Sequence, residues 1–171
     1  MTHAAHSPLR VRPMLLTDCD RVSEIRVRGW QRAYRGIVSD AYLDKLDVEA
    51  DAEVRRARFG RGDGVHLVAE RDGEVLGWAA YGPGREGEVP EDNGELYALY
   101  VDPERLGGGI GHALLTEVTK RCGSYPRLYL WVLTGNSRAR RFYERAGFRP
   151  DGTEQSFEAG GEEVFEVRYV K

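Results

Sequence analysis

The chain is poor in cysteine and lacks any long apolar run. Its two cysteines, Cys19 and Cys122, lie in helical patterns without CxxC or Cys/His spacing. We therefore expect reduced core thiols rather than disulfides or metal ligands. No stretch approaches the ~20 apolar residues that a membrane span requires, and residues 1–8 contain no apolar signal core. We expect a cytoplasmic protein with no membrane partner.

An excess of either charge is also missing. The chain has 25 basic and 28 acidic side chains and a net charge of −3, which offers no electrostatic footprint for nucleic acid. His3 and His6 lie in a polar terminus, and we predict no metal site there. The 171 residues fit one domain, which we place over residues 1–171 with residues 1–8 disordered.

The spacing of apolar residues predicts strands and helices in a mixed order. The expected strands cover residues 9–12, 65–71, 74–81, 96–101, 128–133, 148–157 and 164–170. The expected helices cover residues 17–36, 41–46, 48–59, 109–122 and 136–146, with Thr17, Ser39 and Asn136 as N-caps. This order favours an α/β fold with helices on both faces of a mixed sheet.

A glycine cluster, Leu-Gly-Gly-Gly-Ile-Gly at residues 106–111, lies between a buried strand and a helix. In such a turn, backbone N–H groups without helical partners point outward, and the helix dipole adds partial positive charge. The cluster therefore suits the phosphates of a ligand. A flexible surface loop is the alternative interpretation.

Two other nucleotide-binding motifs fit poorly. No lysine follows the glycines, which excludes a nucleoside triphosphatase loop. Leu114 stands where a dinucleotide fingerprint needs a third glycine or alanine, and no acidic residue ends the strand at 128–133. A nicotinamide-dependent oxidoreductase is therefore a remote alternative.

Residues 99–115, LYVDPERLGGGIGHALL, resemble the acyl-CoA-binding segment of the GNAT superfamily of N-acetyltransferases. Residues 130–133 (LWVL) and 136–148 (NSRARRFYERAGF) are similar to the second half of that family's cofactor site. The resemblance covers nearly the whole chain. It implies a mixed, mostly antiparallel sheet of six or seven strands, with a V-shaped split between the two central strands.

The resemblance also implies a site for acetyl-CoA as acyl donor. The residues it places there are Leu99, Tyr100, Val101, Leu106, Gly107, Gly108, Gly109, Ile110, Gly111, His112, Asn136 and Tyr143. Leu99 and Val101 would pair with the pantetheine arm through their backbones, and residues 107–112 would hold the pyrophosphate. Leu106 departs from the family, which usually has Gln or Arg there; because these contacts are largely main-chain, we expect binding to survive the change.

Tyr143 is our candidate proton donor to the leaving thiolate. It lies seven residues from Asn136, which puts both on one face of a helix. A phenol stays protonated at neutral pH and can give a proton to a thiolate, and this matches the role of the family tyrosine. A core aromatic residue is the alternative interpretation.

Glu95 is our candidate base. The attacking amine must lose a proton, and Glu95 opens the strand that ends at the glycine loop. Strand alternation predicts Glu95, Tyr97, Leu99 and Val101 on one side. The carboxylate would act directly or through water; a solvated residue, with a water chain in place of a base, is the alternative.

The acceptor amine would lie in the gap between the central strands. Trp30, Tyr34 and Tyr97 are the expected aromatic wall, although core packing explains Trp30 and Tyr34 equally well. Possible ammonium partners are Glu86, Glu88, Glu91 and Asp92. An arginine stripe, Arg138, Arg141 and Arg145, could meet the adenosine 3′-phosphate or be a solvated helix face.

The sequence thus predicts an N-acetyltransferase that moves the acetyl group of acetyl-CoA to a primary amine by direct attack. A small-molecule acceptor is favoured over a peptide N-terminus. No cysteine is placed to act as a nucleophile. A non-catalytic acyl-CoA sensor is the main alternative, and a homodimer is compatible with the sequence.

Overall fold

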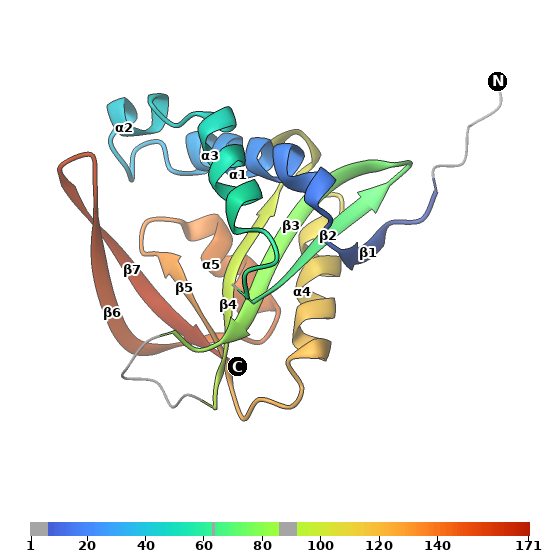
Figure 1. Ribbon diagram of the computed structural model, residues 1–171. Coiled ribbons are helices and arrows are strands. Elements are labelled where there is room, and N and C mark those ends of the chain that lie inside the picture. The colour runs from blue at the N-terminus through green and yellow to red at the C-terminus, as the bar shows by residue number, and fades with distance from the viewer. Residues whose placement is uncertain (1–6, 63, 86–91) are drawn as a thin grey trace, which may run out of the picture.

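A single mixed sheet organises the computed structural model, which describes residues 7–62, 64–85 and 92–171. Over these residues seven strands follow the order β1-β2-β3-β4-β5-β7-β6 (Figure 1). They are β1 (Arg10–Pro13), β2 (Val65–Arg71), β3 (Glu74–Pro83), β4 (Gly94–Val101), β5 (Leu128–Leu133), β6 (Arg149–Ala159) and β7 (Glu162–Val170). β4 and β5 pair in parallel and the other neighbours pair antiparallel. The predicted fold class is confirmed.

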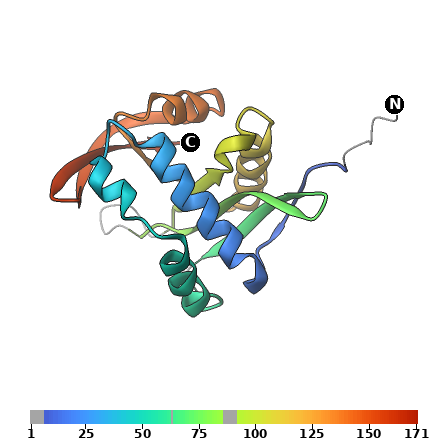
Figure 2. The ribbon, with the colours of Figure 1, turned by 90° about the horizontal axis from the view of Figure 1, so that it is seen from above.

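Helices cover both faces of this sheet. They are α1 (Cys19–Ala33), α2 (Asp40–Asp44), α3 (Val48–Arg58), α4 (Ile110–Arg121) and α5 (Ser137–Arg145). Apolar residues of α1, such as Val22 and Ile25, pack with Val68 and Trp78 on one face. Residues of α4 and α5 pack with Leu67, Leu130 and others on the opposite face. In Figure 2, α1 runs across the sheet.

Several predicted boundaries hold because turn residues define them. The strands at 65–71 and 128–133 are reproduced, and Ser39 and Asn136 cap α2 and α5 by accepting from backbone N–H groups three residues on. Both cysteines are buried and free.

Three local predictions were wrong. Thr17 is not the cap of α1: it lies in a 3-10 turn, Leu16–Asp18, and Asp18 precedes the helix with its carboxylate bonded to Arg12. α1 ends at Ala33 rather than near residue 36, because the chain turns there and Arg35 forms an isolated β-bridge with Val38. Pro13 lies within β1, which an edge strand tolerates since no neighbour needs its N–H.

Part of the predicted disordered terminus lies outside the described residues. Of residues 1–8, the structure describes Ser7 and Pro8, and the Ser7 N–H donates to the Asp72 carboxylate at 3.1 Å. The predicted loop at 82–94 is likewise described only at its ends, where Gly82 and Pro83 belong to β3 and Gly94 belongs to β4.

Candidate active site

The predicted split lies between β4 and β5. Within the described residues these strands pair at Gly94 with Leu128, Glu95 with Tyr129, and Leu96 with Leu130, and then diverge. A cleft of about 880 Å³ opens there. Helices α1, α4 and α5, strands β4 to β7 and the glycine loop all contribute to its lining. The V-shaped split is confirmed.

One edge of β4 presents free backbone groups to this cleft. The Asp102 N–H donates to the Leu76 carbonyl at 2.8 Å, and the register pairs Tyr100 with Trp78. Backbone groups of successive strand residues point to alternate sides. Those of Leu99 and Val101 therefore point away from β3, toward the side from which β5 has diverged. An extended ligand could pair with them as a strand would.

The glycine loop follows a short 3-10 turn, Pro103–Arg105, and leads into α4. Gly107 and Gly109 have φ of +85° and +76°, and Gly109 is the N-cap of α4, a conformation that glycine adopts without strain. Among the described residues, none accepts a hydrogen bond from the amides of residues 107–112. These amides are therefore available to donate to an anion, which the helix dipole of α4 would favour.

Most of the residues predicted for the cofactor lie together around this cleft. Those that line it are Leu99, Tyr100, Val101, Leu106, Gly107, Gly109, Ile110, Gly111, His112, Asn136 and Tyr143. Gly108 does not line it, although it lies in the same loop. Leu106, at the family's Gln or Arg position, is 39% exposed.

Tyr143 lies where α5 meets the cleft. The residue is 8% exposed and packs edge-on against Phe142 and Phe148. Burial, with a smaller effect of Tyr100, raises the pKa of the Tyr143 hydroxyl, so this phenol stays protonated throughout the neutral range. Its hydroxyl makes no hydrogen bond within the part of the chain that the structure describes.

Glu95 lines the cleft but has partners that sequence reasoning missed. It is 3% exposed. Its carboxylate accepts from the Arg85 guanidinium and the Arg85 N–H, both at 3.1 Å, and from the Tyr129 hydroxyl at 3.1 Å. Tyr129 lies beside Glu95 because β5 pairs with β4 at that position. Nothing in the local sequence marks Arg85, which follows a Gly-Pro-Gly run in the predicted loop.

The predicted alternation along β4 was wrong at Tyr97, although Leu99 and Val101 do share one face. Ala80 pairs with Ala98 but Tyr81 pairs with Leu96, so Tyr97 is an extra residue in a β-bulge. Tyr97 consequently packs on the α1 side with Ala98 and Tyr100, while Leu99 and Val101 pack on the α4 side. One inserted residue shifts every later side chain to the opposite face.

The predicted aromatic wall lines the cleft through Trp30, Tyr34 and Tyr97. The Trp30 indole N–H donates to the Tyr100 hydroxyl at 2.8 Å, and the Trp30 and Tyr34 rings meet edge to face at 4.9 Å. The Tyr97 hydroxyl donates to the Pro83 carbonyl at 2.5 Å, and the Arg85 guanidinium lies 3.9 Å from the Tyr97 ring. Tyr97 thus holds Arg85 at the rim of the cleft.

Further residues on the acceptor side were not predicted. Trp131, Gln155, Phe157 and Glu166 line the cleft from β5, β6 and β7. Of the acidic side chains proposed as ammonium partners, Glu86, Glu88 and Glu91 lie outside the described residues, and Asp92 is exposed. Strands β6 and β7 carry polar and apolar residues without a motif, so no sequence signal marks these lining residues.

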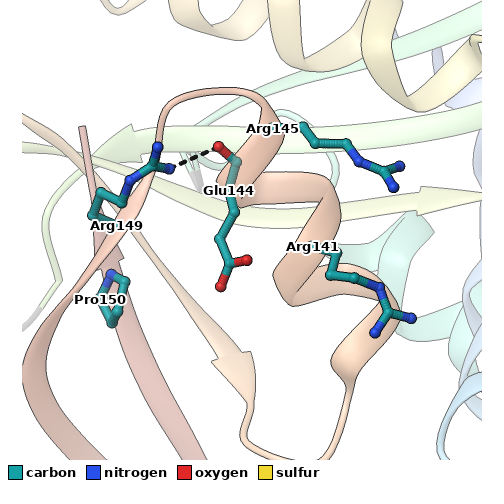
Figure 3. Close-up of a pocket in the computed structure, with 5 residues that line it drawn as sticks. All are labelled: Arg141, Glu144, Arg145, Arg149 and Pro150. Carbon is teal, nitrogen blue, oxygen red and sulfur yellow. Dashed lines mark hydrogen bonds between the residues drawn. The ribbon is translucent and has the colours of Figure 1, made fainter.

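The arginine stripe divides between two hollows. Arg138 and Arg145 line the main cleft. Arg141 instead lines a separate depression of about 360 Å³, with Arg145, Glu144, Arg149 and Pro150. Figure 3 shows Arg141 and Arg145 pointing away from Arg149, which donates to the Glu144 carbonyl at 2.7 Å. In Figure 3 the three guanidinium groups do not point toward one another.

Neither a metal-binding cluster nor a reactive thiol is present among the described residues. No group of three or more His, Cys, Asp or Glu side chains within them could hold a metal ion. Burial raises the pKa of the Cys122 thiol to about 11 and raises that of Cys19. Neither thiol is a ready nucleophile. Of the described helices, none is long and apolar enough to span a membrane.

Known proteins share this fold and sequence pattern. The family model described as "Acetyltransferase (GNAT) family" matches residues 27–148. The chain is 29% identical over 160 residues to the protein called uncharacterized N-acetyltransferase YuaI of Bacillus subtilis (strain 168), covering 92% of this chain and 89% of that protein.

Solved structures of other proteins have a similar fold. A ribosomal-protein-alanine N-acetyltransferase from Brucella melitensis superimposes with a TM-score of 0.74 at 25% identity, covering 95% of this chain and 98% of that chain. The PaiA N-acetyltransferase of Thermoplasma acidophilum, solved in complex with coenzyme A, has a TM-score of 0.71 at 24% identity, with the same coverage of 95% and 98%.

Proposed function

The chain belongs to the acetyltransferase (GNAT) family, and we propose that it transfers the acetyl group of acetyl-CoA to a primary amine of a small molecule by direct attack. Family membership carries the coarser part of this statement, an N-acetyltransferase with acetyl-CoA as donor. The observation that supports the binding mode is the run of unpaired amides at residues 107–112 beside the open edge of β4.

The residues around the cleft fit acetyl-CoA. The amides of residues 107–112 would hold the pyrophosphate, and the backbones of Leu99 and Val101 would pair with the pantetheine amides. When bound, acetyl-CoA supplies an activated thioester whose carbonyl carbon takes the electron pair of the amine and whose thiolate leaves. Arg138 and Arg145, which line the same cleft, would face the adenosine 3′-phosphate.

Two groups of the chain would stabilise the charge that develops during transfer. The Val101 N–H, free on the cleft side of β4, would donate to the thioester oxygen. The Tyr143 hydroxyl would donate to the sulfur. Because burial raises the pKa of Tyr143, the phenol is a weaker acid than a thiol, and its main contribution is a strong hydrogen bond to the leaving sulfur.

Glu95 would receive the proton of the attacking amine. Its carboxylate is held by Arg85 and Tyr129 at the narrow end of the cleft. Because these donors already occupy the carboxylate oxygens, we favour relay through a water molecule over direct contact. The buried, protonated thiols of Cys19 and Cys122 support transfer without a covalent enzyme intermediate.

Release of free thiol from acetyl-CoA, measured with a panel of small amines, amino acids and a peptide N-terminus, tests this proposal. We expect turnover with at least one small amine. Tyr143→Phe should lower kcat by about 10²-fold and change coenzyme A affinity, measured by calorimetry, far less. Tyr125→Phe is the matched control, since Tyr125 packs against the same core outside the cleft.

Other outcomes would identify the alternatives. Binding of coenzyme A without turnover of any amine would indicate a sensor. Turnover restricted to the peptide would contradict the small-molecule acceptor. Thermal stabilisation by NAD and not by acetyl-CoA would contradict the proposed cofactor.

A further inference from the structure

Asp102 fixes the point at which β4 leaves the sheet and the glycine loop begins. It is 5% exposed, and its main-chain N–H donates to the Leu76 carbonyl at 2.8 Å. Its carbonyl accepts from the Arg105 N–H, and its carboxylate accepts from the Glu104 N–H at 3.0 Å. One residue thereby holds both ends of the turn Pro103–Arg105, which leads directly into the loop.

The second carboxylate oxygen of Asp102 bonds to Arg21 in α1. The guanidinium of Arg21 donates to this oxygen at 2.5 Å, to the Val75 carbonyl of β3 at 3.0 Å and to Glu24 at 2.7 Å. Arg21 is 81 residues from Asp102 along the chain. It therefore ties a helix, a central strand and the start of the loop to one another.

Neither Arg21 nor Asp102 lines the cleft, but the residues that they hold do. Pro103, Arg105, Leu106 and Gly107 all line it. A second bond supports the same turn, because the Arg32 guanidinium of α1 donates to the Pro103 carbonyl at 3.1 Å. A group of backbone amides binds an anion only when its N–H groups converge. The position of this turn therefore determines how tightly the site can bind an anion.

We infer that Arg21 and Asp102 are positioning residues for the coenzyme. Their ion pair fixes the position of the backbone amides of residues 107–112 relative to β4. The inference rests on the proposed use of acetyl-CoA.

A second ion pair provides a matched control. Asp18 is 8% exposed, pairs with Arg12 at 2.7 Å and accepts from the Leu15 N–H at 2.7 Å. It therefore resembles Asp102 in burial and bonding, but it joins β1 to the start of α1, and none of these residues lines the cleft. Loss of either ion pair should destabilise the fold to a similar extent. Only loss of the Arg21–Asp102 pair should weaken coenzyme A binding.

The experiment compares Asp102→Asn, Arg21→Met and Asp18→Asn with the wild type. Coenzyme A binding is measured by calorimetry, unfolding by urea, and KM for acetyl-CoA and for the amine by thiol release. We expect Asp102→Asn and Arg21→Met to weaken coenzyme A binding at least tenfold and to raise KM for acetyl-CoA without raising KM for the amine. Asp18→Asn should change binding less than twofold.

Arg21→Met keeps the carboxylate that caps the turn, so it reports on the tether even where Asp102→Asn folds poorly. Equal weakening by Asp18→Asn and Asp102→Asn would overturn the inference, as would unchanged binding in Arg21→Met. Wild-type protein that does not bind coenzyme A would overturn the proposed function and this inference with it. Wild-type affinity retained in both Asp102→Asn and Arg21→Met would overturn the inference alone.

Discussion

At the scale of the residue, Glu95 is held in the cleft by hydrogen bonds from two other side chains. Its carboxylate accepts from Arg85 and from the Tyr129 hydroxyl, and Arg85 is itself stacked on the Tyr97 ring. This arrangement fixes the orientation of the carboxylate, which a proton relay through water requires. It also neutralises the charge of Glu95, so that burial of the carboxylate is tolerated.

Glu95→Gln tests the proposed base, since it keeps the shape of the side chain and removes its ability to take a proton. We expect kcat/KM for the amine to fall by about 10²-fold, with coenzyme A affinity retained. Tyr129→Phe is the control, because it deletes one hydrogen-bond donor and leaves the carboxylate, and it should cost far less activity. Glu95→Gln with wild-type kcat/KM would show that the amine loses its proton by another route.

At the scale of the element, the loop between β4 and α4 depends on backbone conformation more than on side chains. We predict that Gly109→Ala strains the backbone, since Gly109 has φ of +76°, and lowers the free energy of unfolding by about 1 kcal/mol. The strain moves the amides, so coenzyme A binding by calorimetry should weaken by about tenfold.

Gly161→Ala separates strain from binding. Gly161 has φ of +80° in the turn between β6 and β7, and an added Cβ meets open space at both positions. Urea unfolding should show a similar loss of stability for the two variants, with coenzyme A affinity unchanged in Gly161→Ala. Wild-type affinity in Gly109→Ala would rule out these amides as the main anion contact.

The elements that the sequence predicted well are those with local signals. The turn at Asp72 and Gly73 sets the hairpin of β2 and β3, and Ser39 and Asn136 mark helix starts. The bulge at Tyr97 has no such signal, because it depends on how β3 and β4 pair. The contacts of Glu95 with Arg85 and of Asp102 with Arg21 also depend on tertiary structure, which a reading of motifs along the chain does not reveal.

At the scale of the whole molecule, partly buried ion pairs join α1 to the sheet in addition to its apolar contacts. Arg12 and Asp18 join β1 to the start of α1, and Arg21 and Asp102 join α1 to the turn after β4. Burial disfavours the charged form of each carboxyl, but hydrogen bonds from the arginines and from backbone N–H groups outweigh it. These bonds hold the pKa of Asp18 and of Asp102 below the ordinary value of 3.8.

Stability should therefore fall in acid. The unfolded chain binds a proton at each of these carboxyls near the ordinary pKa of 3.8, whereas the folded chain binds it only at lower pH. The stabilisation is thus fully present above that value and is lost as the pH falls through the lower, folded pKa. We expect urea unfolding to give a lower free energy of unfolding at pH 3 than at pH 7.

Asp18→Asn, which cannot titrate at this position, tests the source of this loss. It should be less stable than the wild type at pH 7, and the difference in stability should narrow at pH 3. Asp92→Asn, at an exposed position, serves as control and should match the wild type in stability at both pH values. If the difference in stability between Asp18→Asn and the wild type stays constant between pH 7 and pH 3, the ion pair is not the source of the acid sensitivity.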